Sequence, residues 1–320
     1  MNIFDALALK GLSRVGDDSV TKILRFSYTH GLSTLEELSK VGISKLPLKT
    51  VPSSLKAFLE AQDFKSARTS VEKDLTSWRT QGIETIVLGS ENYPKQLLGL
   101  YNPPPFLFCK GNLELLKHTS VIAVVGTRKN TRKGEQIACK TVEAFAKRGF
   151  SIVSGLALGI DAIAHRAALD FNAPTIAVLV DLVSIAPSSN RALADEIIEK
   201  GGLWVAENPP GTKVIPAFFA KRDRIQAGLS TAVFAIETSI DGGTMHAVNA
   251  ALSIRRPVFV PDATAAAYPD LTIRAISGTQ QLINDQKATP YTRESYERIG
   301  AQLEKIAAQF GFDAQEELPL

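Results

Sequence analysis

Short apolar segments alternate with longer amphipathic segments from residue 119 to residue 260, and this alternation constrains the fold more than any other feature of the chain. Each apolar segment has the length and the continuous hydrophobicity of a strand that is buried on both faces of a sheet. Each is followed by a polar loop and then by a segment with helical periodicity. The expected strands are 121–125, 151–153, 175–180, 203–206, 231–236 and 257–260.

The segments between these strands predict one helix that ends near Arg148 and four further helices over about 161–169, 191–200, 217–228 and 244–254. Repeated strand–helix units with apolar strands indicate a parallel sheet that is covered by helices on both faces. We therefore expect an α/β fold with a doubly wound, Rossmann-like parallel sheet. The strand at 257–260 is the last clear one, and one or two helices are expected after residue 275.

The flanking regions suggest three parts. Residues 1–77 predict a small helical domain, because leucines recur at helical spacing with glycines between them. This domain is either a SAM-like or helix–hairpin–helix-like module or a helical bundle that only packs on its neighbour. Residues 78–290 are expected to form the Rossmann-like core, and residues 291–320 a C-terminal acidic helical tail.

Composition excludes several classes of protein. No apolar run reaches the roughly 18 residues needed to cross a bilayer, so we expect no transmembrane helix. Asp5 interrupts the start of the chain, so we expect no signal peptide. Both observations favour a cytoplasmic protein. Cys109 and Cys139 are far apart and the 4 histidines form no cluster, so we expect two buried free thiols, no metal site and no disulfide. A net charge of +3 does not by itself indicate a nucleic-acid partner.

In an open parallel sheet, ligands bind at the carboxyl ends of the strands. The loop after the first strand carries Gly126, Thr127, Arg128 and Lys129, and Arg132 follows at the start of the next helix. Cations around a helix N-terminus indicate a phosphate site; the alternative is a solvated basic helix end. The loop matches neither GxGxxG nor a P-loop, which disfavours NAD binding and P-loop nucleotide hydrolysis.

The later loops add similar chemistry. Ser154, Gly155 and Gly159 allow close approach of the backbone, Asp161 stands where a helix N-cap is expected, and His165 is interpreted as a packed core residue. The remaining candidates for binding a phosphate-containing ligand are Lys221, Arg222, Arg224, Gly242, Gly243 and Thr244. We find no catalytic constellation and expect no cofactor.

The order and spacing of these loops resemble the DNA-processing protein A (DprA/Smf) family from about Ile83 to Ile283. The residues that carry the resemblance are Tyr93-Pro94, Pro104-Pro105 to Gly111-Asn112, Gly126-Thr127-Arg128, Ser154-Gly155 to Asp161, Ala164-His165, Glu207 to Gly211, Arg222 to Ser230 and Gly242-Gly243-Thr244.

The resemblance implies a Rossmann-like core that binds single-stranded DNA, forms a homodimer, helps to load a RecA-type recombinase in natural transformation or recombination, and performs no enzymatic turnover. It implies that Arg128 contacts the DNA backbone, with Lys221, Arg222 and Arg224 as further candidates. The chain departs from the family at Asp223, where the family usually has asparagine, and this acid weakens the local positive field. We also expect no winged-helix tail of the kind that the family usually carries.

A second hypothesis is a nucleotide-binding sensor of the broader Rossmann-like group, with or without nucleotide hydrolase activity. The segment Asp241 to Thr244 is similar to the P-G-G-x-G-T-x-x-E motif of related phosphoribohydrolases. Ala247 and Val248 stand near the position where that motif has its catalytic glutamate, which counts against the hydrolase.

Overall fold

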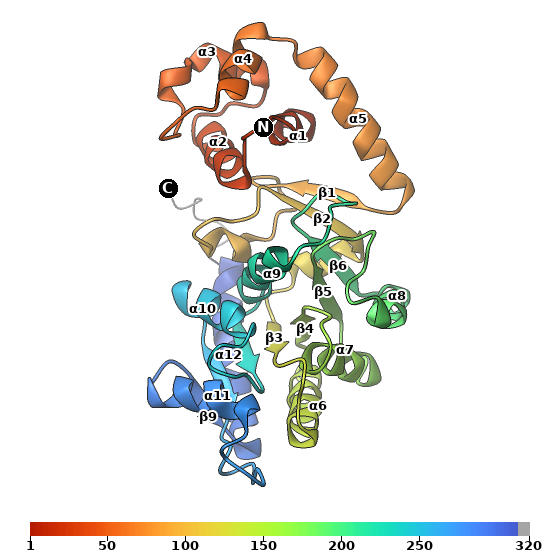
Figure 1. The fold of residues 1–320 in the computed structure, drawn as a ribbon, viewed down its shortest axis with the longest axis vertical. Coiled ribbons are helices and arrows are strands. Elements are labelled where there is room, and N and C mark those ends of the chain that lie inside the picture. Colours follow the sequence, from red (N-terminus) through yellow and green to blue (C-terminus); the bar gives the residue numbers. More distant parts are fainter. Residues whose placement is uncertain (313–320) are drawn as a thin grey trace. The chain divides into compact units, whose positions relative to one another are not determined.

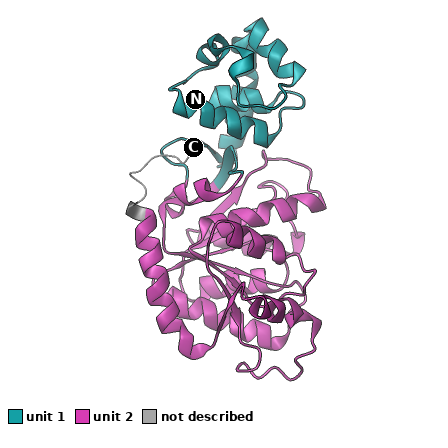
Figure 2. Ribbon diagram, turned by 90° about the vertical axis from the view of Figure 1, so that its left-hand side faces the viewer, with its two compact units in different colours: residues 1–93, 102–109, 319–320 teal, residues 94–101, 110–318 magenta. Residues whose placement is uncertain are grey.

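The computed structural model describes residues 1–312 (Figure 1). These residues divide into two compact units (Figure 2). The first unit comprises residues 1–93 and 102–109, and the second comprises residues 94–101 and 110–312. The part of the expected acidic tail beyond residue 312 lies outside the described residues.

The first unit consists of helices and one antiparallel pair of strands. Asp5 is buried and accepts hydrogen bonds from the Arg68 guanidinium (2.9 Å) and the backbone N–H of Leu35 (3.0 Å), so this carboxylate holds three helices together. The strands pair with Glu84 opposite Cys109. The elements are α1 (Ile3–Lys10), α2 (Asp17–Thr29), α3 (Leu35–Val41), α4 (Ser53–Ala61), α5 (Phe64–Thr80), β1 (Glu84–Val87) and β2 (Phe106–Gly111).

The second unit is built on a parallel sheet with the strand order β6-β5-β4-β3-β7-β8-β9. The chain moves outward from β3 through β4 and β5 to β6 and then returns to place β7 on the other side of β3. The order therefore reverses between β3 and β7, and such a switch point opens a crevice at the carboxyl ends of the two strands. The strands are β3 (Val121–Val125), β4 (Ser151–Ser154), β5 (Thr175–Leu179), β6 (Leu203–Ala206), β7 (Ala232–Ala235), β8 (Val258–Pro261) and β9 (Thr289–Tyr291).

Helices cover both faces of this sheet because its strands are apolar on both sides. On one face, Ile122 and Val124 of β3 pack into a core with helices α6, α7 and α12. On the other face, Ala123 and Val125 of the same strand pack against α9, α10 and α11. The helices are α6 (Arg132–Ala146), α7 (Ile160–Asp170), α8 (Arg191–Glu199), α9 (Pro216–Leu229), α10 (Met245–Ser253), α11 (Arg274–Asn284) and α12 (Tyr296–Phe312).

The expected doubly wound α/β fold is confirmed, with three corrections in detail. Strand β8 is not the last strand, because β9 pairs with it at the edge of the sheet. The sequence did not predict β9, since it contains Pro290 and proline is tolerated in a strand only at a sheet edge. Gly159, not Asp161, is the N-cap residue of α7. Cys109 and Cys139 are both free thiols, but Cys139 is only partly buried.

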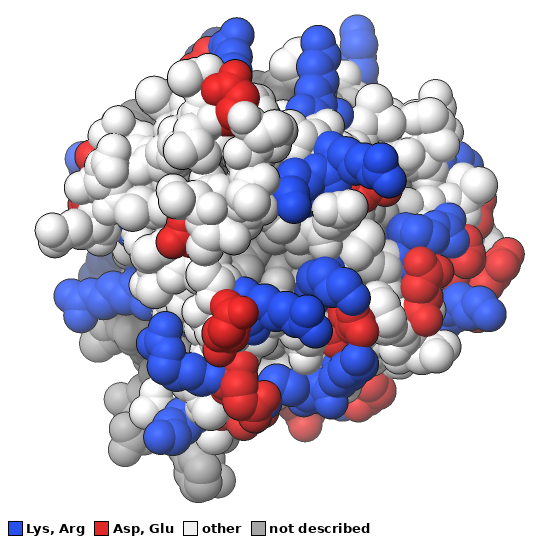
Figure 3. All heavy atoms as spheres, turned by 90° about the horizontal axis from the view of Figure 1, so that it is seen from below, with Lys and Arg blue, Asp and Glu red and all other residues white. Residues whose placement is uncertain are grey.

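Charges of both signs are interspersed over the face of the molecule drawn in Figure 3. The net charge of +3 therefore does not gather into one large positive patch on that face, and local geometry decides where an anion can bind. Within residues 1–312, no helix is both long enough and apolar enough to span a membrane.

Candidate functional site

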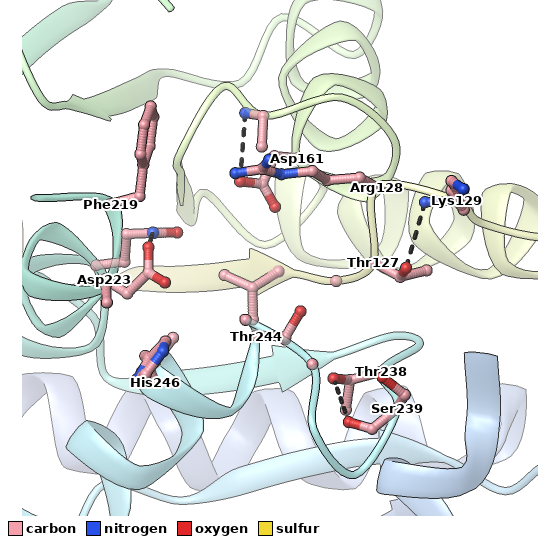
Figure 4. A pocket seen from close by; sticks show the side chains of 18 of the residues that line it. Thr127, Arg128, Lys129, Asp161, Phe219, Asp223, Thr238, Ser239, Thr244 and His246 are labelled. Carbon is pink, nitrogen blue, oxygen red and sulfur yellow. Dashed lines mark hydrogen bonds between the residues drawn. The ribbon is translucent and has the colours of Figure 1, made fainter. Parts of the chain in front are cut away.

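A cavity of about 620 Å³ lies at the switch point between β3 and β7. Its walls come from the loop after β3, the start of α7, one face of α9, the loop after β7 and the start of α11 (Figure 4). The predicted site residues that line it are Gly126, Thr127, Arg128, Lys129, Arg222, Gly242, Gly243 and Thr244.

The loop after β3 is held by its neighbours on both sides. The backbone N–H of Thr127 donates to the carbonyl of Glu237 (2.7 Å), and the Thr127 carbonyl accepts from the N–H of Ile160 (3.2 Å). Gly159 has a φ of +77°, and a Cβ there would lie 2.3 Å from the Thr127 carbonyl oxygen. Gly159 therefore supports the site by letting two loops approach, and it does not line the cavity.

Two cations of this loop are exposed at the mouth of the cavity. The Arg128 guanidinium carbon lies 5.7 Å from the centroid of the Phe219 ring on α9. The backbone N–H of Lys129 donates to the hydroxyl of Thr127 (3.2 Å), which fixes the turn from which the Lys129 side chain extends. Both side chains are exposed, so a ligand at the mouth of the cavity can contact them.

The N-terminus of α6 is not open to an anion, contrary to expectation. The hydroxyl of Thr131 accepts from the N–H of Gly134 (3.0 Å) and caps the helix. The buried carboxylate of Glu237 accepts from the Thr131 N–H (2.9 Å) and the Thr131 hydroxyl (2.6 Å). A carboxylate of the protein thus occupies this helix end, and Arg132 is exposed outside the cavity.

Arg222 lies deep in the cavity wall, with only 3% of its surface exposed. Its Nη1 is 3.4 Å from the carboxylate of Asp223, and its guanidinium packs against the backbone of Gly155. Burial raises the pKa of Asp161, which also lines the cavity, and the charge of Arg222 opposes that rise in pKa. A buried guanidinium therefore sits beside two carboxyl groups.

Asp223 is the second of these carboxyl groups. Burial raises its pKa to about 6, although the nearby Arg222 charge favours the ionised form. Its Oδ1 accepts a hydrogen bond from the Gln226 amide (2.8 Å). Asp223, which the sequence singled out as a departure from the family, thus lies in the cavity itself.

Other predicted site residues make contacts within the protein and lie outside the cavity. Lys221 (3.1 Å) and Arg224 both form ion pairs with Glu207, which is buried, and neither lines the cavity. The hydroxyl of Ser154 donates to the Val124 carbonyl (2.7 Å), so Ser154 ties β4 to β3. His165 is a core residue as expected: it bonds to Thr175 (2.7 Å), and burial lowers its pKa to about 3.

Part of the site on α9 was not predicted from the sequence, which had offered only Arg222 on this side of the helix as a ligand-binding candidate. Phe219, Arg222, Asp223 and Gln226 are spaced i, i+3, i+4 and i+7, so all four project from one side of the helix into the cavity. This helical spacing was the available signal. Arg274 at the start of α11 was also missed, and it forms an exposed ion pair with Asp241 (2.7 Å).

The loop after β7 closes the cavity from the other side. Thr244 is the N-cap residue of α10, and its side chain makes no capping hydrogen bond. A Cβ on Gly243 would meet nothing within 4 Å, which leaves the loop backbone open on that side. No group of three or more acidic, His or Cys side chains within the described residues could hold a metal ion.

A doubly wound parallel sheet with a cation-bearing cavity at its switch point defines the class of Rossmann-like ligand-binding domains. Within that class, the chain belongs to the DNA recombination-mediator protein A family, whose model matches residues 84–302. The family resemblance seen in the sequence is thereby confirmed.

Individual relatives agree with this assignment. DNA processing protein DprA of Bacillus subtilis is 36% identical over 204 residues, covering 63% of this chain and 68% of that protein. The structure of DNA processing protein A from Streptococcus pneumoniae superposes with a TM-score of 0.74 at 26% identity, covering 91% of this chain and 95% of the other. The structure of the Helicobacter pylori protein, described for its single-stranded DNA binding mode, has a TM-score of 0.60 at 29% identity, covering 70% and 96%. The chain spans little more than half the length of some other curated relatives.

Proposed function

We propose that this chain binds single-stranded DNA, with the strand passing over the mouth of the cavity at the switch point. The observation that carries the proposal is the placement of the Arg128 cation beside the Phe219 ring at that mouth. A cation for a phosphate and an aromatic face for a base are the two features of sequence-tolerant binding to single strands. The single-stranded DNA binding of the H. pylori relative supports the proposal.

Further groups around the mouth suit a phosphate backbone. Lys129 and Arg274 are exposed, and the loop that contains Gly242 and Gly243 places Thr244 in the cavity wall. Contacts of this kind carry little sequence information and release counterions. Binding is therefore expected to weaken steeply as the salt concentration rises.

The wider role follows from the family. The relatives are DNA processing proteins, and we extend that role to this chain: it protects incoming or processed single strands and assists loading of a RecA-type recombinase in transformation or recombination. In this proposal the protein is a cytoplasmic homodimer that acts without catalytic turnover. Residues 78–290 act as the DNA-binding core, residues 1–77 as an accessory helical module and residues 291–320 as a tail. A monomer mass measured by light scattering across micromolar concentrations would rule out the proposed homodimer.

The alternative ligand is a free nucleotide. A cavity of about 620 Å³ falls in the size range of small-molecule sites. A nucleotide-sensing role therefore remains the second candidate.

One binding experiment separates the two ligands. A fluorescent oligo-dT is titrated with the full chain at several salt concentrations, in the presence or absence of free nucleotides. Salt-sensitive binding that mononucleotides do not displace is the expected result. Absence of oligonucleotide binding, with saturable binding of one nucleotide, would replace the DNA role with the nucleotide-sensing one.

A further inference from the structure

An exposed carboxylate lies beside the cavity, next to a cation that the proposed function assigns to DNA. Asp241 belongs to the loop after β7, and its neighbours Ser239 and Gly242 line the cavity. The Asp241 carboxylate accepts a hydrogen bond from Nη2 of Arg274 at 2.7 Å, and Arg274 also lines the cavity. An acid of the protein itself therefore holds one of the groups that would contact a phosphate.

The two segments that carry this ion pair are fixed to each other by backbone contacts. The N–H of Gly278 on α11 donates to the carbonyl of Thr238 in the loop after β7 (2.8 Å). A Cβ on Gly278 would lie 2.6 Å from the carbonyl oxygen of Ser239, so a glycine is needed for helix and loop to approach this closely. The backbone thus keeps Asp241 within reach of Arg274, and the fold does not depend on the ion pair.

The ion pair is open to solvent. The side chain of Arg274 is 79% exposed and that of Asp241 is 68% exposed. Exposed ion pairs are weak, because water and salt compete for both partners. A phosphate that reaches Arg274 can therefore displace the carboxylate, while the contact at Gly278 keeps the loop and the helix together.

The carboxylate is charged whenever a strand arrives at neutral pH. A hydrogen bond from the Ser239 side chain and the charge of Arg274 lower the pKa of Asp241. An ionised carboxylate both occupies the Arg274 guanidinium and repels an approaching phosphate. At Arg128 the arrangement differs, because the neighbour of that guanidinium is the uncharged ring of Phe219.

We propose that Asp241 is a competing anion that limits the affinity of the site for single-stranded DNA, by holding Arg274 until a phosphate of the strand replaces it. This inference rests on the proposed DNA binding and adds a residue of this chain that opposes it.

The test replaces the carboxylate with an amide of nearly the same shape. Asp241→Asn keeps one oxygen that can accept a hydrogen bond from the Ser239 side chain, but it no longer competes as an anion. In anisotropy titrations of oligo-dT with the full chain at about 0.15 M salt, this variant is expected to bind about two- to five-fold more tightly than the unsubstituted protein. That range corresponds to one exposed ion pair. Asp241→Ser is a second variant that also lacks the charge.

Asp285→Asn is the matched control. Asp285 forms an exposed ion pair with Lys287 (3.1 Å) at the other end of α11, and it does not line the cavity. The helix has 11 residues, so the two ends are about 16 Å apart, which exceeds the screening length of about 8 Å at this salt concentration. The control loses the same charge and should leave the affinity for oligo-dT nearly unchanged.

A double substitution tests whether Asp241 acts through Arg274. Arg274→Gln alone is expected to weaken binding and to reduce the slope of log affinity against log salt by about 0.7, the value for one phosphate contact. In the Arg274→Gln background, Asp241→Asn should lose most of its gain, because the cation for which it competes is gone. Thermal melts verify that each variant is folded.

A folded Asp241→Asn variant that binds oligo-dT no better than the unsubstituted protein would overturn the inference and leave the proposed DNA binding standing. A gain no larger than that of Asp285→Asn would assign the effect to net charge, and a gain that persists in full without Arg274 would assign it to the loop. Either result contradicts competition for Arg274. If the unsubstituted protein binds no strand, the proposed function fails together with this inference.

Discussion

The guanidinium of Arg222 occupies the space where a side chain on Gly155 would stand: a Cβ built on Gly155 would lie 1.5 Å from Nη1 of Arg222. This contact joins the loop after β4 to helix α9. It means that the glycine is required by a neighbour's side chain and not by direct contact with a ligand.

Gly155→Ala is therefore expected to destabilise the protein by about 1–3 kcal/mol, the usual cost of overpacking a buried site. The free energy of unfolding is measured by urea denaturation. Gly243→Ala is the matched control, because a Cβ there meets nothing within 4 Å, and its effect should stay within about 0.5 kcal/mol. Unchanged stability of Gly155→Ala would mean that Arg222 can move aside freely.

Arg128→Ala is expected to weaken binding to oligo-dT and to reduce the slope of log affinity against log salt by about 0.7, the value for one lost phosphate contact on a single strand. Lys140→Ala is the control, since Lys140 is exposed on α6 in an ion pair with Glu143 and lies outside the cavity. Anisotropy titrations at several salt concentrations measure both quantities. A slope that falls equally in the two variants would show that only overall charge matters.

Arg224→Ala is expected to lower the free energy of unfolding and not to weaken the affinity for DNA. Arg224 and Lys221 neutralise Glu207, whose side chain is 1% exposed, so removing Arg224 leaves a buried carboxylate with less compensation. We expect a loss of about 1–3 kcal/mol, below the usual cost of a broken buried pair because Lys221 remains. Urea denaturation measures it, and adding Glu207→Gln should restore part of the loss. If the folded variant instead loses DNA affinity and salt dependence as Arg128→Ala does, then Arg224 contacts DNA.

Asp223 makes stability depend on pH. Its pKa in the folded protein is raised to about 6 by burial, so the folded state binds a proton that the unfolded state has released between about pH 4 and pH 6. Stability contributed by this group is therefore highest below that window and falls as the pH rises through it. The charged or titratable groups that act on it are Arg222, Asp161, His246 and Arg128.

Asp223→Asn removes this titration and is expected to be more stable than the unsubstituted protein at pH 8, by up to about 3 kcal/mol, with the difference shrinking below about pH 6. Urea denaturation of both proteins across this pH range measures the difference. A gap that is independent of pH would assign the effect to something other than the ionisation of Asp223.

Much of the fold was accessible from the sequence. The segments 121–125 and 203–206 were predicted with the bounds of β3 and β6, because an uninterrupted apolar run between polar loops suits only a strand buried on both faces. Edge strand β9 was missed because an edge needs no such run. Its Pro290 also argues against a strand when neighbours are unknown.

The candidate site was predicted by location more than by contact. The loops after β3 and β7 were found because parallel strands bring their carboxyl ends to one edge of the sheet. Which cation faces the cavity could not be predicted from loop position alone: Lys221, Arg222 and Arg224 are near neighbours in sequence, yet each step along α9 turns the side chain by about 100°. One of them enters the cavity and the other two meet Glu207.

The sequence by itself thus determined the doubly wound sheet, its family and the sheet edge at which the cavity lies, because these depend on hydrophobic periodicity and on loop position. Only the tertiary structure decided that Glu237 closes the start of α6, that Glu207 holds Lys221 and Arg224, and that Arg222 lies in the cavity wall beside Asp223. The physical reason is that a charged side chain takes its role from the partner that burial places beside it, and those partners come from distant parts of the chain.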